Sequence, residues 1–140
     1  MKFEDIRLFL ETHHKGVVTT RRSNGATQAS IVVCGAFNGD AAFVAVLGNS
    51  AKVHNLRRDP NCTVLAVTED WRQFAVVEGK ARMFDYGNTD AEQMRVMLRD
   101  VYMACGDKEH PDWVEYDLAM KRQRAVVVLV RPDRVYGQLS

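Results

Sequence analysis

The chain has 140 residues, of which 46% are hydrophobic and 26% are charged. These proportions are typical of one globular domain, which we expect to span residues 1–140. The formal charge of +1 argues against a general nucleic-acid-binding protein, which normally carries a broad basic excess. No apolar run approaches the roughly 20 residues that span a bilayer, and the first residues lack the apolar region of a signal peptide. We therefore expect a cytoplasmic protein with no membrane partner.

The first half of the chain predicts one helix and three strands. Apolar residues spaced by three and four predict a short amphipathic helix near the N-terminus. Asn24-Gly25 is typical of a tight hairpin turn between two strands. The expected elements are a helix over 3–13 and strands over 16–22, 26–37 and 41–47.

The second half predicts further strands and two longer helices. The expected strands cover 61–68, 73–85 and 125–130, with a separate extended segment at Val135-Tyr136, and the expected helices cover 94–105 and 112–122. Apolar residues of 94–105 recur at helical spacing, so its methionines are expected in a core rather than around a cofactor. Five or six short strands, with helices at the ends and edges, predict a mainly β fold: a small closed or nearly closed β-barrel with flanking helices.

Three cysteines, Cys34, Cys62 and Cys105, are widely spaced along the chain. Each lies within or at the end of an apolar pattern, so we expect three small buried side chains in a reducing compartment. The sequence has no Cys-x-x-Cys and no His-x-x-x-His pair, and we therefore expect no zinc or other metal site.

The segment from Gly48 to Pro60 lies directly between two predicted strands. Asn49 and Ser50 are residue types that cap helix N-termini, and Pro60 ends the helix within about three turns. Lys52 falls in the first turn, where free N–H groups and the helix dipole favour an anion. The spacing is consistent with a phosphate site and also with an ordinary connecting helix whose lysine is solvated.

No catalytic motif is evident elsewhere. The chain has no Gly-x-Ser-x-Gly, no Gly-x-x-x-x-Gly-Lys-Ser, no Gly-x-Gly-x-x-Gly and no His-Glu-x-x-His. Ser50 and Lys52 do not form a Ser/Lys dyad, because residues two apart on a helix point away from each other. A phosphate site without acid–base machinery indicates that a bound cofactor carries the chemistry.

Several segments, in order along the chain, carry a family resemblance: 16–20, 23–25, 50–60, 75–81, 112–120 and 133–137. Together they resemble the pyridoxamine 5′-phosphate oxidase-like, flavin-binding split-barrel superfamily. The resemblance is strongest to the branch that uses the deazaflavin coenzyme F420, the flavin/deazaflavin oxidoreductases of B type. It covers the chain nearly from end to end.

The resemblance implies a six-stranded Greek-key split barrel that forms a homodimer, with two cofactor clefts at the subunit interface. It implies that Ser50, Ala51, Lys52 and Asn55 face the phosphate or tail of the cofactor. Ser30, Ile31 and Val32 on the second strand would run beside the ring, and Trp71 would help to close the cleft. A planar ring needs a flat apolar strand face, and a phosphate needs a lysine and amides.

Two positions depart from the family pattern. Vitamin-B6 oxidases of the superfamily carry basic residues on the second strand, whereas 27–34 has none, so we do not expect true pyridoxamine phosphate oxidase activity. In the deazaflavin branch a basic residue often precedes the key lysine by two positions, where this chain has Ser50. The flavin mononucleotide FMN therefore stays an alternative to the preferred F420.

The function expected on this basis is an oxidoreductase that uses F420 or FMN for hydride transfer to an unsaturated small-molecule substrate. The proton donor is left open between Tyr136, Tyr102 and a bound water. One alternative is a carrier or sensor that binds FMN, deazaflavin or haem without turnover. Another is a nucleic-acid-binding barrel that uses Lys52, Arg57, Arg58 and the basic run 121–124. The nearly neutral net charge and the scarcity of aromatic residues beside these cations disfavour this alternative.

Overall fold

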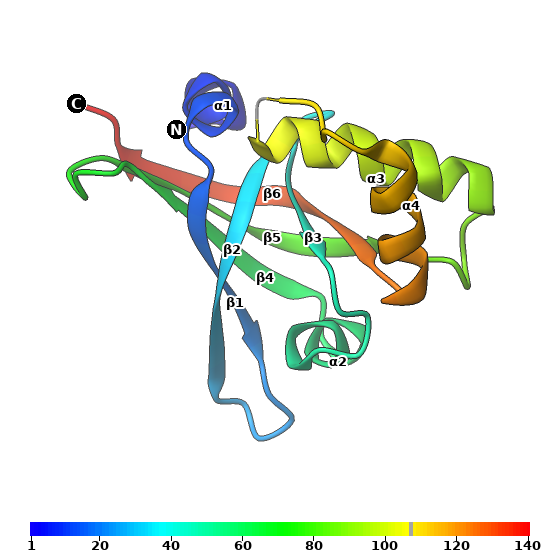
Figure 1. Ribbon diagram of the computed structural model, residues 1–140. Coiled ribbons are helices and arrows are strands. Elements are labelled where there is room, and N and C mark those ends of the chain that lie inside the picture. Colours follow the sequence, from blue (N-terminus) through cyan, green and yellow to red (C-terminus); the bar gives the residue numbers. More distant parts are fainter. Residues whose placement is uncertain (107) are drawn as a thin grey trace.

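The computed structural model describes residues 1–106 and 108–140 (Figure 1). Its helices are α1 (Phe3–Thr12), α2 (Ala51–Arg58), α3 (Ala91–Gly106) and α4 (Trp113–Arg122). Its strands are β1 (Lys15–Arg21), β2 (Thr27–Phe37), β3 (Asp40–Ala45), β4 (Asn61–Val67), β5 (Phe74–Phe84) and β6 (Val126–Gln138). None of the described helices is long and apolar enough to cross a membrane.

The six strands form a closed antiparallel barrel in the order β1-β2-β3-β6-β5-β4, with β4 pairing back onto β1. The mainly β barrel with flanking helices expected from the sequence is thus confirmed. The ends of most elements lie within a few residues of the predicted ones, which is the ordinary spread of helix and strand boundaries.

The last strand is longer than predicted. The sequence indicated a strand over 125–130 followed by a separate extended segment, but β6 continues through Pro132. Its register with β5 shifts between Glu78 and Gly79, so Asp133 bulges out without a partner on β5. A proline is tolerated at such a bulge because no ladder hydrogen bond is required of it there.

Side chains from the six strands fill the barrel, and a helix closes each of its ends (Figure 1). Ile6 and Leu10 of α1 are buried at one end, and Val53 and Leu56 of α2 are buried at the other. Burying a side chain of this size contributes about 1.5–3 kcal/mol. The position of α2 is therefore fixed by its apolar face, which leaves its polar positions available for a site.

A second core lies outside the barrel, where α3 and α4 cover β3 and part of β6. Its buried residues include Met94, Leu98, Val101, Ala42, Val127 and Leu129. Gly35 of β2 is needed beneath α3, because a Cβ there would collide with the carbonyl group of Ala104. The assignment of the methionines to a core is confirmed: Met94 is fully buried and Met97 packs against the same cluster.

All three cysteines are buried and unpaired. Burial raises the pKa of Cys34, Cys62 and Cys105 to about 12 each. Thiols with such pKa values stay protonated at neutral pH and are poor nucleophiles. Their interpretation as small buried side chains is confirmed.

The helices leave uncovered the outer surface of β1, β4 and the first part of β2, whereas α3 covers β2 around Gly35. An apolar row crosses this surface and continues onto β5 and β6 along the strand register, with Ile31 opposite Val17, Val17 opposite Leu65, Leu65 opposite Val76, and Val76 opposite Tyr136. Val17 and Leu65 in this row are half-buried, and Val76 is only 2% exposed. Ile31 is 84% exposed, an unusually high value for a large aliphatic side chain. We refer to these five residues as the apolar row.

Candidate functional site

The loop before α2 is held tightly against the corner between α4 and β6. The amide of Gly48 donates to the carbonyl of Gln123 at 3.0 Å, and the amide of Ser50 donates to the carbonyl of Leu47 at 3.1 Å. Gly48 has no room for a side chain, because a Cβ there would collide with the carbonyl oxygen of Arg124. The N-terminus of α2 is therefore set by one backbone bond to the α4–β6 corner, by a turn within the loop and by the buried apolar face of the helix.

Ser50 occupies the N-cap position predicted for it but does not cap the helix. Its backbone is extended and its hydroxyl makes no hydrogen bond to the first turn. The buried hydroxyl oxygen has no partner in the described part of the chain. The amides of residues 51–53 precede the first intrahelical bond, which His54 donates to Ser50 at 3.2 Å. This helix end thus presents free donors, as an anion site requires.

Lys52 lies in the first turn of α2 and is half-buried. In the described residues its ammonium group makes no ion pair or hydrogen bond, whereas many other cationic side chains of the chain have partners. A partly buried, unpartnered lysine beside free helix amides is suited to hold a phosphate group.

Asn55 is 7% exposed and its side chain is occupied within the chain. Its amide nitrogen donates to the hydroxyl of Thr20 at 3.1 Å, and its oxygen accepts from the guanidinium of Arg58 at 3.2 Å. That guanidinium also donates to the carbonyl of Arg21 at 2.7 Å. Asn55 therefore ties α2 to β1. The sequence singled out Asn55 but gave no sign of Thr20 as its partner, because 35 residues separate the two.

The three β2 residues assigned to the cofactor ring do not share a face. Ile31 lies on the uncovered outer surface, whereas Val32 is 8% exposed and belongs to the barrel core. Ser30 is half-buried. Successive side chains of a strand point to opposite sides, so only Ile31 and its alternate neighbours can offer side chains to a ligand on the outside.

Trp71 stands at the tip of the β4–β5 hairpin, 81% exposed and with a backbone φ of +66°. The turn is held by hydrogen bonds from the Thr68 hydroxyl to Asp70 at 2.6 Å and from the Trp71 amide to the Thr68 carbonyl at 3.0 Å. The hydrogen bonds from the Thr68 hydroxyl and the Arg72 amide hold the pKa of Asp70 below its usual value. A bulky residue at positive φ is strained, and here a rigid turn presents it to solvent.

Trp71 and Lys52 lie far apart within one chain. The helix that carries Lys52 directly precedes β4, and the hairpin that carries Trp71 follows the other end of the same strand (Figure 1). One chain therefore brings together Ser50, Ala51 and Lys52 but does not bring Trp71 to them.

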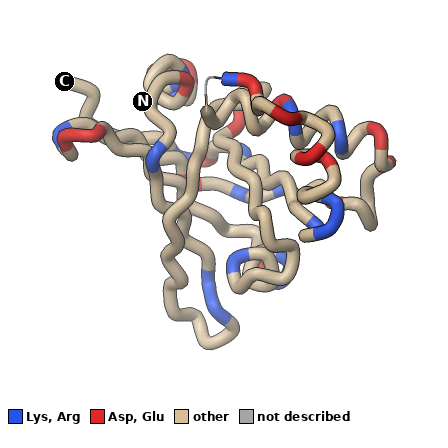
Figure 2. Tube along the Cα trace, viewed as in Figure 1, with Lys and Arg blue, Asp and Glu red and all other residues tan. Residues whose placement is uncertain are grey.

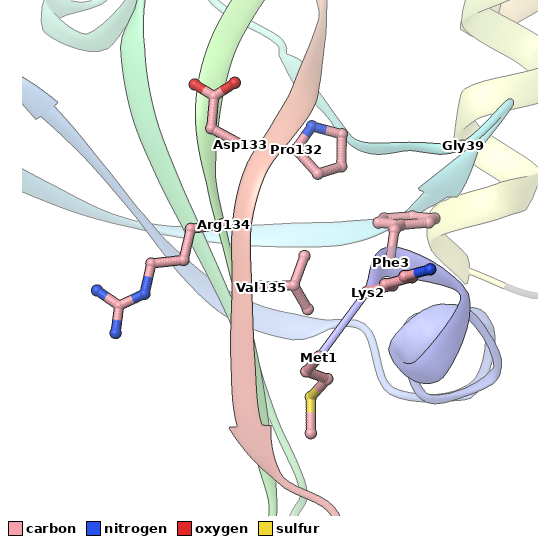
Figure 3. A pocket seen from close by; sticks show the side chains of 8 residues that line it. All are labelled: Met1, Lys2, Phe3, Gly39, Pro132, Asp133, Arg134 and Val135. Carbon is pink, nitrogen blue, oxygen red and sulfur yellow. The ribbon is translucent and has the colours of Figure 1, made fainter.

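A separate hollow of about 630 Å³ lies where the N-terminus meets the β6 bulge (Figure 3). Figure 3 shows Phe3 and Val135 beside it, with Arg134 pointing outward. Asp133 at its edge lies 3.5 Å from the ammonium of Lys80. None of the site residues predicted from the sequence lines this hollow.

Comparisons with known proteins show the family of the chain and agree with its fold. The sequence model of the family described as pyridoxamine 5′-phosphate oxidase matches residues 3–138. Similar solved structures include a conserved hypothetical protein of Mycobacterium tuberculosis (TM-score 0.77, 18% identity, 99% of this chain and 84% of that one). An F420 reductase (TM-score 0.64, 17% identity) is matched over 93% of this chain and 94% of its own. The heme storage protein HutZ of Vibrio cholerae (TM-score 0.70, 12% identity) is matched over 99% of this chain and 96% of its own.

Proposed function

Because the chain belongs to the pyridoxamine 5′-phosphate oxidase family, we propose that it is a homodimeric oxidoreductase that binds F420, or alternatively FMN, in a cleft at the subunit interface. The observation that carries this proposal is the unpartnered, half-buried Lys52 beside the free amides of the α2 N-terminus. The similarity to an F420 reductase supports the choice of a deazaflavin.

The first turn of α2 is suited to the phosphate end of such a cofactor. Lys52 supplies a positive charge, the amides of residues 51–53 supply donors, and the Ser50 hydroxyl has hydrogen-bonding capacity that the protein does not use. Ala51 is exposed at this end of the helix. Asn55 supports the site from behind by fixing the helix on β1.

The outer face around Ile31 is suited to a planar ring. Ala29, Ile31 and Val33 are exposed on one side of β2 and carry no charge. Hydride transfer is the chemistry that a flavin or deazaflavin supplies when bound. The chain contributes binding, orientation and exclusion of water, and it has few acid–base groups for proton transfer. Without a basic residue on β2, a role as a true pyridoxamine phosphate oxidase is disfavoured.

A homodimer would account for the exposure of two large apolar side chains, Ile31 and Trp71. Ile31 and the exposed parts of the apolar row would be buried if two copies packed their uncovered sheets together about a two-fold axis. Such a two-fold arrangement could also bring Trp71 of one copy to the α2 helix of the other, although the two lie at opposite ends of β4 in one chain. Burial against a second copy explains why a strained turn presents a tryptophan to solvent.

A carrier or sensor that binds a cofactor without turnover is the second candidate. The similarity to a heme storage protein favours this alternative over other non-enzymatic functions. It differs from the leading proposal in one respect, namely that a reduced cofactor bound to the protein would not be consumed by any substrate.

A titration with F420, FMN and haem tests the proposal, with wild type, Lys52→Ala and the exposed control Lys108→Ala. We expect F420 to bind best, with at least tenfold weaker binding in Lys52→Ala, corresponding to about 1.4 kcal/mol for one charged phosphate contact. Lys108→Ala should bind as wild type. Binding of FMN alone would indicate an FMN enzyme or carrier, and binding of haem alone would favour the storage alternative. Failure to bind any of the three would refute the cofactor assignment.

A further inference from the structure

A hollow of about 920 Å³ lies between α2, the loop after β5 and the corner that joins α4 to β6. We call it the corner cleft. His54 and Arg57 of α2 line it, together with the run 121–124, whereas Lys52 does not. Lys52 and His54 are two residues apart on a helix and therefore point to nearly opposite sides. The corner cleft is thus separate from the proposed phosphate site.

Positive charge is concentrated in the corner cleft. Figure 2 shows Lys and Arg positions both on α2 and at the corner after α4. Arg57 pairs with Asp85 at 2.9 Å, and Asp85 is the one carboxylate among the lining residues. Lys121, Arg122 and Arg124 make no ion pair or side-chain hydrogen bond with the described residues. In a chain whose formal charge is +1, three unpartnered cations in one hollow create a local field that attracts anions.

Helix-end electrostatics explains only part of this cluster. Lys121 and Arg122 lie in the last turn of α4, where the helix dipole favours cations. Arg124 lies beyond the helix at a φ of +55°. Its amide donates to the Lys121 carbonyl at 3.2 Å, and the next amide, of Ala125, donates to the Met120 carbonyl at 3.0 Å. This is the Schellman helix end, in which glycine is the usual residue at the Arg124 position. An arginine held in a backbone conformation that favours glycine indicates a requirement for its side chain.

We propose that the corner cleft binds a small, multiply charged organic anion that carries phosphate groups or several carboxylates. The volume lies within the range of small-molecule sites. Leu47 and Tyr86 add apolar surface to the wall, which suits an organic ligand better than a bare inorganic ion. The low net charge of the chain favours a small anion over nucleic acid. The inference does not depend on the proposed cofactor, since Lys52 takes no part in it.

Backbone amide NMR of the isotope-labelled full chain tests the proposal, with tripolyphosphate and citrate as probes. We expect saturable shifts for 47–49 and 121–124. The Lys121→Gln/Arg122→Gln variant should weaken the affinity at least tenfold. Arg124→Gly should weaken it as well while leaving the melting temperature equal to or above that of wild type, because glycine suits the backbone there. The control Lys108→Gln/Arg131→Gln removes two exposed cations that form no ion pair within the described part of the chain, and it should bind the probes as wild type.

Three further measurements complete the test. Lys52→Ala should bind tripolyphosphate normally, which separates this proposal from the cofactor assignment. Displacement of tripolyphosphate by F420 but not by FMN would identify the anion as an extension of the cofactor, and no displacement would identify an independent ligand. Shifts spread over the whole surface, equal losses in the control variant, or selective binding of a DNA oligonucleotide would overturn the proposal.

Discussion

The side-chain amide of Asn55 donates a 3.1 Å hydrogen bond to the hydroxyl of Thr20, which is 2% exposed on β1. Both groups are buried, and the Asn55 oxygen is satisfied by Arg58. This contact joins the helix that carries Lys52 to the wall of the barrel. The helix has eight residues and would not be stable alone. The hydrogen bond to Thr20 helps to hold it in a fixed position on the barrel.

Replacing Asn55 should therefore lower the stability of the fold, and any effect on cofactor binding should be a consequence of that. We expect Asn55→Ala to lower the free energy of unfolding by about 1–3 kcal/mol, because the Thr20 hydroxyl is left buried without its partner. Urea denaturation measures the change, and His54→Ala, an exposed neighbour on the same helix, should stay within about 0.5 kcal/mol of wild type. If Asn55→Ala were as stable as wild type but bound cofactor poorly, Asn55 would be a ligand-contact residue rather than a positioning one.

Replacing an exposed apolar side chain of the uncovered sheet by a charged one should break the proposed dimer. We expect Ile31→Glu to convert the dimer to monomer, because each copy would bury an unpaired carboxylate in the apolar interface, at a cost of several kcal/mol. Light scattering after size exclusion measures the mass. Val114→Glu is the matched control, since Val114 is also largely exposed but lies on α4. A wild-type chain that is monomeric at micromolar concentration would contradict the dimer itself.

The sequence predicted the architecture because the barrel depends on local patterns. Alternation along 73–85 and the helical spacing of 94–105 are periodic patterns that can be recognised without knowing which strands or helices pack against them. The continuation of β6 through Pro132 was not predictable in this way, since it depends on a register shift against Gly79 of a different strand. Long-range pairing decided that boundary.

The candidate site was predictable at the level of segments rather than side chains. The short helix before Pro60 and the place of Lys52 in its first turn follow from local sequence signals, although the Ser50 hydroxyl makes no capping hydrogen bond. The orientation of Asn55 depends on Thr20, and the division between Ile31 and Val32 depends on which face of β2 the barrel buries. Such facts come from packing between distant parts of the chain, which a single sequence does not display.

The three buried thiols should make the fold sensitive to alkali. In the folded chain the pKa of each thiol is raised to about 12 by burial, against an ordinary value of 9.0. The unfolded chain therefore releases these protons first, and stability falls as the pH rises from about 9 towards 12. Each thiol contributes a slope of about 1.4 kcal/mol per pH unit within that window.

Denaturation at pH 8, 9, 10 and 11 measures this slope. Cys62→Ala should be less stable than wild type at pH 8 because of the cavity it leaves, yet its stability should fall less steeply above pH 9, since one ionising thiol has been removed. If the free energy of unfolding fell equally steeply with pH in wild type and in Cys62→Ala, Cys62 would have the same pKa in the folded and the unfolded chain.

Gly48 should tolerate no side chain. Gly48→Ala would drive a Cβ into the Arg124 carbonyl and push the loop before α2 away from the α4–β6 corner. We expect a loss of about 1–3 kcal/mol in the free energy of unfolding, as for other overpacked positions. Gly106→Ala is the control, because a Cβ there would meet no described residue outside its own helix turn within 4 Å, and it should be neutral or slightly stabilising. Because the same loop separates the Lys52 site from the corner cleft, Gly48→Ala should also weaken binding at both. A variant that lost stability but kept full affinity at both sites would show that the loop anchors the fold without shaping either site.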